Sequence, residues 1–240
     1  MPPEALAAGL WALVAASSLV MGALLALTDW VRDRRLRLLI GFGAGALVSA
    51  VAYDLFAEAV AVSATGVSVA AGFVGGALAF YVGDELIERL PGAKEEGSGG
   101  LPILFGAILD GIPESVVLGL TLVGGGVPSV AVLVAIFVSN IPESIAASTR
   151  MREAGRSPVW IVGIWTAVAA ASAAAAAIGY GLLAGTSGEN IAFMNAFAAG
   201  AILVLLADDL LPQAHAERDK LVGLMTAAGF ALAAFLSFNE

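Results

Sequence analysis

The string Ile-Pro-Glu-Ser occurs twice in this chain, within LPILFGAILDGIPESVVLGLTLV (residues 101–123) and within PSVAVLVAIFVSNIPESIAAST (residues 128–149). Each apolar stretch is long enough to cross a bilayer as a helix, which places each glutamate in hydrocarbon. A carboxylate there costs several kcal/mol, and a proline inside a helix costs about 3 kcal/mol more. Because both costs recur together, the string indicates a functional site.

The two prolines also change what the helix backbone offers. Pro113 cannot donate a hydrogen bond to the carbonyl of Leu109, and Pro142 cannot donate one to the carbonyl of Val138. Each helix therefore presents a freed carbonyl oxygen close to its own glutamate. Oxygen groups of this kind bind cations.

Composition places the chain among polytopic membrane proteins. Of its 240 residues 60% are hydrophobic and 13% are charged, and the mean hydropathy is +0.94. The net charge of −9 carries no prediction of a nucleic-acid partner, and the lack of cysteine excludes disulfides and thiolate metal sites. We expect the lipid bilayer as a partner and no organic cofactor.

The apolar runs between polar, glycine or proline breaks predict an all-α fold with eight transmembrane helices. Their approximate limits are 5–29, 38–61, 66–88, 101–123, 128–149, 158–184, 190–211 and 220–238. We expect a single transmembrane domain over residues 1–240. The linker PGAKEEGSGG (91–100) is too short to be a domain of its own.

All lysines and arginines, 11 in number, fall in alternate loops of this eight-span plan. They are Arg32, Arg34, Arg35 and Arg37; Arg89 and Lys94; Arg150, Arg152 and Arg156; and Arg218 and Lys220. Because loops on the cytoplasmic side carry an excess of basic residues, the pattern predicts a multi-pass protein of the cytoplasmic (inner) membrane. Both termini are then extracytoplasmic.

The chain also matches itself. Residues 42–59 (FGAGALVSAVAYDLFAEA) agree with residues 197–214 (FAAGAILVLLADDLLPQA) at eight of eighteen positions without a gap, and AAGF recurs at Ala70 and Ala227. These matches pair spans two and seven, and spans three and eight, which run in opposite directions. They predict a 3+2+3 inverted repeat: residues 1–90, the two site helices of 101–149, and the inverted copy over 157–240. Transporters are commonly built in this way.

Together these features resemble the ZIP family of zinc and iron permeases, over nearly the whole chain. Family members have eight spans in a three-two-three order, both termini outside, and a metal site on spans four and five. The corresponding strings here read Asp110-Gly111-Ile112-Pro113-Glu114-Ser115 and Ser139-Asn140-Ile141-Pro142-Glu143-Ser144. The resemblance implies a divalent metal ion as substrate.

The strings depart from the family's in ways that change ligand chemistry. Asp110 stands where the family usually has histidine, Ser139 where histidine or glutamine is expected, and span six (158–184) has no acidic residue. The candidate metal ligands are Asp110, Glu114, Asn140 and Glu143, with Ser139 as a secondary candidate. Residues three or four apart share a helix face, so one cation could receive all four oxygens. Two cations bridged by the glutamates fit equally well.

Other membrane acids predict a path to and from this site. Asp54 and Glu58 lie near the extracytoplasmic end of span two, and Asp208 and Asp209 lie near the cytoplasmic end of span seven. The alternative is that these acids are solvated interface residues. We expect His215, in the run AHAERDK, to be a solvated loop residue.

The sequence thus predicts a transporter that moves a divalent transition-metal cation, by the family's habit inward, through alternating access around a midplane carboxylate site. By resemblance Zn²⁺ comes first, with Fe²⁺ or Mn²⁺ close behind, although oxygen-only ligands favour harder ions. The alternative is a permease fold that binds metal as a sensor or scaffold without transport, or that carries another dication. Small-residue faces, such as the one over 72–79, also leave a homodimer open.

We expect no enzyme. Tyr53-Asp54 and Gly83-Asp84 are similar to the paired aspartates of intramembrane aspartyl proteases, which must share a proton. Here the two acids fall near opposite ends of their spans, about 20 Å apart in depth. The sequence has no Walker A string, so ATP-driven pumping is not expected.

Overall fold

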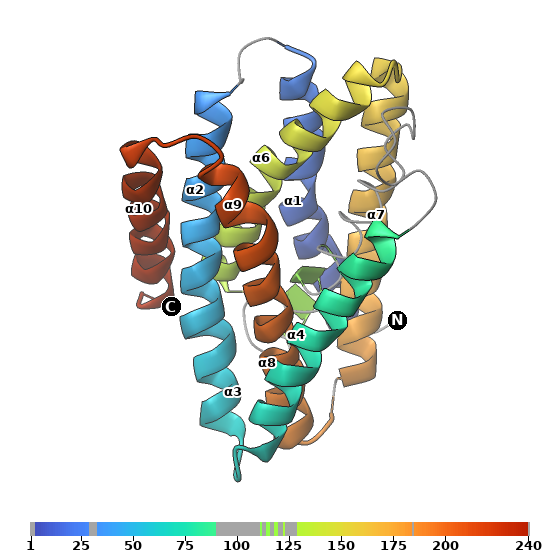
Figure 1. Cartoon of the computed structure of the whole chain (residues 1–240). Helices are drawn as coiled ribbons and strands as arrows, with labels where there is room; N and C mark the ends of the chain where they lie inside the picture. The colour runs from blue at the N-terminus through green and yellow to red at the C-terminus, as the bar shows by residue number, and fades with distance from the viewer. Residues whose placement is uncertain are drawn as a thin grey trace.

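The computed structural model describes residues 3–28, 33–89, 129–183 and 185–239, together with Gly111, Glu114, Ser115, Leu118, Gly119 and Leu122. In this part of the chain every regular element is a helix (Figure 1). Seven of the described helices are long and apolar enough to cross a membrane. The predicted all-α fold is therefore confirmed for these residues, and the helices are compatible with a multi-pass membrane protein.

The described helices fall on both sides of residues 90–128. Before them come α1 (Pro3–Ala26), α2 (Arg34–Ser49), the π-helix η1 (Ala50–Phe56), α3 (Ala57–Val62) and α4 (Val67–Glu88). After them come α6 (Val130–Glu153), α7 (Pro158–Leu183), α8 (Gly188–Leu205), the π-helix η2 (Leu206–Leu210), α9 (Leu211–Ala214) and α10 (Lys220–Ser237). Each π-helix joins its two flanking α-helices into one span.

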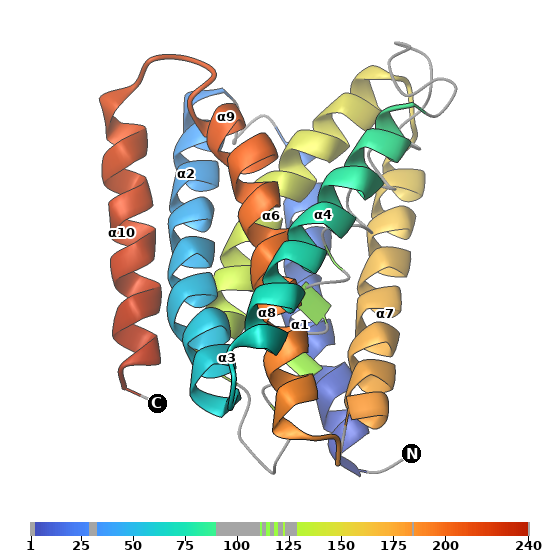
Figure 2. The same ribbon diagram turned by 60° about the horizontal axis from the view of Figure 1, so that its bottom comes forward.

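The fourth predicted span, 101–123, lies mostly outside the described residues, so the eight-helix 3+2+3 arrangement stays a prediction. Helices α4 and α6 run in the same direction through the bundle (Figure 2). The end of α4 and the start of α6 therefore lie at opposite ends of the bundle. Between Arg89 and Ser129 the described helical residues are Gly111, Glu114, Ser115, Leu118 and Gly119.

The described basic residues gather at one end of the bundle. The connections α1–α2, α6–α7 and α9–α10 and the last turn of α4 lie there, whereas both chain ends and the α3–α4 turn lie at the opposite end (Figure 2). Arg32 and Lys94 fall outside the described residues. This segregation is the one the alternate-loop pattern predicts, and which side of a membrane it faces stays a prediction.

Two helix pairs pack with their backbones in contact. Along α2 and α10, a Cβ atom on Gly45 would lie 1.9 Å from the carbonyl oxygen of Thr226, and a Cβ on Gly229 would lie 1.9 Å from that of Phe42. No carbon atom fits at such distances, so only glycine permits this approach.

The pair α4 and α8 repeats this contact. A Cβ on Gly200 would lie 2.1 Å from the carbonyl oxygen of Phe73, and a Cβ on Gly76 would lie 1.9 Å from that of Phe197. In the self-match, Phe197 aligns with Phe42 and Gly200 aligns with Gly45. Equivalent residues of the two repeats therefore make equivalent contacts.

The π-helices η1 and η2 also fall at matching positions of the repeat. Asp54 lies in η1 and Asp209 lies in η2, and these two residues align in the self-match. A π-helix inserts a residue into an α-helix and is often found at functional sites. Both long spans thus change their side-chain register beside an aspartate.

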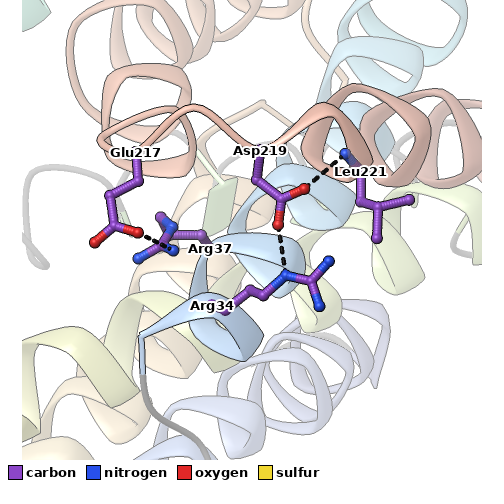
Figure 3. A network of polar contacts seen from close by, with 5 residues as sticks. All are labelled: Arg34, Arg37, Glu217, Asp219 and Leu221. Atoms are coloured by element: carbon purple, nitrogen blue, oxygen red, sulfur yellow. Dashed lines mark hydrogen bonds and ion pairs between the residues drawn. The ribbon is translucent and has the colours of Figure 1, made fainter.

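A polar network, called here the Arg34–Asp219 clasp, joins the start of α2 to the α9–α10 connection (Figure 3). Arg34 Nε donates to Asp219 Oδ2 at 2.6 Å, and Arg37 Nη2 donates to Glu217 Oε2 at 2.6 Å. Asp219 also accepts a hydrogen bond of 3.0 Å from the Leu221 N–H, which caps α10 (Figure 3).

A second clasp lies at the opposite end of the bundle. Glu189, at the start of α8, accepts hydrogen bonds from the Ala64 N–H at 2.6 Å and from the Ser63 and Ser68 hydroxyls. If the offset of the self-match is extended toward the start of both spans, Glu189 falls at the position of Arg34. Each clasp therefore ties the first turn of one long span to a connection in the other half of the chain.

We expect the Arg34–Asp219 clasp to weaken in acid. The hydrogen bond from the Arg34 guanidinium lowers the pKa of Asp219, and the bond from Leu221 adds to this lowering. Because this pKa is lower in the folded chain, the clasp stabilises the fold above the unfolded value of about 3.9, and this is lost as pH falls through the lowered folded value. The unfolding temperature of the native chain should exceed that of Asp219→Asn at pH 7, and the difference should shrink progressively as pH falls below about 3.9. A difference that stays constant as the pH falls would refute the claim.

Candidate functional site

A small cavity lies among α1, α6, α7 and the described residues of 111–118. Its polar lining consists of Glu114, Ser115, Asn140, Glu143 and Ser172. The space open to the centre of a water-sized sphere is about 10 Å³, which matches a single water or a single dehydrated ion. Three of the four predicted metal ligands therefore share one cavity, with α1 supplying small apolar residues as its wall.

Helix α6 presents Asn140 and Glu143 to this cavity because they are three residues apart on one face. Pro142 lies inside α6 without ending the helix, and it leaves the Val138 carbonyl without its usual N–H partner. The Ser144 hydroxyl donates to the Asn140 carbonyl at 2.8 Å, which gives the proline-containing turn an additional bond. Asn140 is only 4% exposed, and Glu143 is half-buried.

Helix α1 closes the site by a close approach to the same turn. A Cβ on Gly22 would lie 2.5 Å from the Ile141 carbonyl oxygen, so a side chain there would push α1 away from α6. The approach brings Ala12, Ala15 and Ala16 to the cavity wall. Small residues on α1 therefore set the width of the cavity.

Glu114 provides the second carboxylate and is 4% exposed. It interacts electrostatically with Glu143, which in turn interacts with Asp209 and with Arg150. Among the described residues that line the cavity there is no lysine, arginine or histidine to neutralise the two carboxylates. A buried charge needs a partner, and a dication would balance these two.

The other two predicted ligands differ in what the structure describes. Asp110 lies outside the described residues. Ser139 is buried, but its hydroxyl donates to the Ile136 carbonyl at 3.0 Å and its backbone lies against α2, where a Cβ on Gly43 would be 2.8 Å from the Ser139 Cα. Ser139 thus faces α2, whereas Asn140 faces the cavity.

The predicted path acids differ in their surroundings. Asp54 accepts hydrogen bonds from the hydroxyls of Ser129 at 3.3 Å and Ser237 at 3.1 Å, so the start of α6 and the end of α10 meet at η1. Asp209 is half-buried, accepts a hydrogen bond from Gln213, and lies within electrostatic reach of Glu143.

The remaining candidates on the path are exposed to the surroundings of the bundle. Glu58 and Asp208 are both exposed. His215 is also exposed, and its Nδ1 lies 3.0 Å from the Leu211 carbonyl oxygen. Asp209 thus connects η2 to the cavity through its electrostatic interaction with Glu143.

Two cavity residues were missed by the sequence analysis. Ser115 follows Glu114 directly, and its hydroxyl donates to the Gly111 carbonyl at 2.6 Å. Ser172 is the one polar residue in the alanine run over 169–177. A single polar residue within a run of alanines is a weak indication that its side chain lies at a polar cavity.

The donor atoms suit a cation held by oxygen. Carboxylates, an amide oxygen and hydroxyls are ligands of hard or borderline dications. Within the described residues, no three His, Cys, Asp or Glu side chains come close enough to hold a metal ion between them. Compared with known proteins, the chain matches no protein-family model and no curated protein.

Proposed function

We propose that this chain transports a divalent transition-metal cation across the cytoplasmic membrane, inward, by alternating access around the cavity of Glu114, Asn140 and Glu143. The resemblance to the ZIP permeases puts zinc first, with iron or manganese close behind. The supporting observation is that two membrane carboxylates and an amide converge on a cavity of single-ion size whose described lining has no basic side chain.

A route for release is supported by the order of the acids. Glu143 interacts electrostatically both with Glu114 and with Asp209. Asp209 lies in η2, in the span that ends near the basic loops (Figure 2). Each step along these carboxylates keeps the cation beside a compensating charge, which lowers the cost of crossing a low-dielectric interior. The cation would leave toward the cytoplasm past Asp209.

The proposed movement follows from the inverted repeat. Helices α1, α6 and α7 and the fourth span would carry the ion against a block of α2, α4, α8 and α10. The backbone contacts of α2 with α10 and of α4 with α8, together with the two clasps, favour a rigid block. Equivalent contacts in both halves support two related states of opposite direction.

A second function is favoured by one observation. No histidine or other nitrogen ligand occurs in the described cavity lining, apart from the amide of Asn140, whose oxygen is the donor. A site of this kind could bind metal as a sensor or scaffold without carrying it, or could carry another dication.

Transport in proteoliposomes distinguishes these functions. We expect Zn²⁺, Fe²⁺ or Mn²⁺ added outside to accumulate inside vesicles that contain the purified chain, with a rate that saturates with concentration. A metal-sensitive dye trapped in the vesicles reads the flux, and empty vesicles give the leak. Saturable metal binding to the purified protein without flux would refute transport and favour the sensor or scaffold function. If the purified chain shows neither binding nor flux, the proposed metal site is refuted.

A further inference from the structure

Asp54, in η1, joins the ends of two other helices. Its Oδ1 atom accepts hydrogen bonds from the Ser129 hydroxyl at 3.3 Å and from the Ser237 hydroxyl at 3.1 Å. Ser129 is the N-cap of α6, and Ser237 is the last residue of α10. A single carboxylate oxygen therefore ties the start of α6, the helix that carries Asn140 and Glu143, to η1 and to the end of α10.

This junction lies at the end of the bundle away from the described basic residues, where the chain itself ends (Figure 2). Asp54 is half-buried there. A carboxylate withdrawn from water needs hydrogen-bond donors in its place, and donors to a charged oxygen bind more strongly than donors to a neutral one. The two hydroxyls therefore hold three helices together where water would otherwise solvate Asp54.

Two of the three residues belong to the proposed rigid block of α2, α4, α8 and α10. Asp54 lies in η1, which continues α2, and Ser237 lies in α10. The rings of Tyr53 and Phe238, their neighbours along the chain, have centroids 5.0 Å apart, so η1 packs against the end of α10. Ser129 instead caps α6, one of the helices proposed to carry the ion. The Ser129–Asp54 bond thus crosses from the block to the ion-carrying helices.

The repeat-related aspartate at the other π-helix is bonded differently. Asp209 aligns with Asp54 in the self-match. It accepts a hydrogen bond from Gln213, four residues further along its own span, and it interacts electrostatically with Glu143. Asp54 therefore joins separate helices, whereas the hydrogen bond to Asp209 stays within one span. An inverted repeat with two related states predicts this kind of asymmetry when one end of the bundle is closed.

We propose that Asp54, Ser129 and Ser237 form a latch that closes the extracytoplasmic end of the bundle and opens once in each transport cycle. The inference rests on the proposed function, because movement of α6 against the block would separate Ser129 from Asp54. Water that enters the opened end would then solvate the carboxylate. The latch can therefore release without leaving a buried charge unpaired.

Reversible crosslinking tests the latch. The chain has no cysteine, so Ser129→Cys combined with Ser237→Cys supplies the only two thiols. Both hydroxyls lie within 3.3 Å of the same oxygen atom, so a bifunctional methanethiosulfonate with a short spacer should join the two thiols. In proteoliposomes we expect the crosslink to reduce dication uptake to the leak of empty vesicles, and a reductant that is then removed should restore it. Binding of Mn²⁺, read by electron paramagnetic resonance, should stay within twofold because the cavity lining is unchanged.

Tyr53→Cys combined with Phe238→Cys is the matched control. These positions adjoin Asp54 and Ser237, but both lie within the block, and both side chains are exposed to the reagent. Crosslinking them should leave uptake at the rate of the uncrosslinked pair. The latch is refuted if the chain crosslinked between positions 129 and 237 still transports at the uncrosslinked rate, and the proposed function then stands. If the native chain itself gives no uptake, the proposed function fails and the latch fails with it.

Hydrogen exchange gives a second measurement if the double-cysteine variant does not fold. Ser237→Ala removes one bond of the latch without changing α6. We expect the amide of Val132, which Ser129 caps at 3.2 Å, to exchange about fivefold faster in this variant, as the loss of one hydrogen bond predicts. Ser17→Ala, whose hydroxyl donates within α1 to the Val14 carbonyl, should leave this rate unchanged. Equal exchange at Val132 in the native chain and in Ser237→Ala would refute the latch.

Discussion

Dication uptake is expected to fall to the leak of empty vesicles when Glu143 is replaced by glutamine, and also when Glu114 is. The substitution keeps the volume of the side chain and removes one of the two negative charges that line the cavity. A dication then loses charge balance in a low-dielectric interior. We expect a loss of at least about 100-fold in the initial rate, because changes to residues that only support a metal ligand already cost about 10- to 100-fold.

If the two glutamates only held the helices together, either glutamine variant should be less stable than the native chain. A metal site predicts the opposite. The two carboxyl groups line one cavity whose described lining has no basic side chain, so ionising both without a metal costs free energy. Either variant should therefore unfold in metal-free buffer at the same temperature as the native chain or higher. Added Mn²⁺ or Zn²⁺ should raise the unfolding temperature of the native chain, because ligands that bind the folded state stabilise it, and should leave both variants unchanged.

Glu153→Gln serves as the control for this pair. Glu153 lies on the same helix α6 but is exposed at its end, so its charge is already solvated. The variant should transport at the native rate and keep the metal-dependent rise in unfolding temperature. Native uptake by both Glu114→Gln and Glu143→Gln would remove the site, whereas their loss of folded protein in metal-free buffer would favour a structural pairing of helices.

The meeting of Glu114, Asn140 and Glu143 was predictable because simple geometry governs it. Residues 140 and 143 share a face at a spacing of three, and the two Ile-Pro-Glu-Ser strings lie in neighbouring apolar runs. Ser139 is close to Asn140 in sequence, yet it faces α2. Successive residues of a helix point about 100° apart, and the sequence does not show which neighbour lies on which side. Which face of α6 each residue occupies relative to its neighbours depends on Gly43 of α2 and Gly22 of α1, because these glycines let the two helices pack closely against α6.

The π-helices and Ser172 could not be predicted for a related reason. These spans are apolar on every face, so the sequence shows no change in hydrophobic periodicity where the π-helix inserts a residue near Asp54 or near Asp209. The repeat itself was visible in the sequence, but its register in the third and eighth spans was not. The AAGF strings align Gly72 with Gly229. The backbone contacts instead make Gly76, one helical turn further on, the residue equivalent to Gly229, because Gly76 packs against Phe197 as Gly229 packs against Phe42.

The second large effect is expected at the glycines that join the helix pairs. Gly229→Ala on α10 and Gly200→Ala on α8 should each lower the unfolding temperature by roughly 10 °C, from a destabilisation of about 3 kcal/mol. The added methyl groups would lie 1.9 Å from the Phe42 carbonyl oxygen and 2.1 Å from that of Phe73. Because the obstructing atoms are backbone, no rotamer change can relieve the overlap, and the helices must separate.

Gly223→Ala provides a control within α10 itself. A Cβ there meets no atom within 4 Å, so the methyl group enters open space. Since alanine favours a helix over glycine by up to about 1 kcal/mol, this variant should be as stable as the native chain or slightly more so. Thermal unfolding of all three purified variants in one detergent, followed by size-exclusion chromatography, makes the comparison. If Gly229→Ala and Gly223→Ala unfold at the same temperature, α2 and α10 do not make the backbone contact on which the rigid block depends.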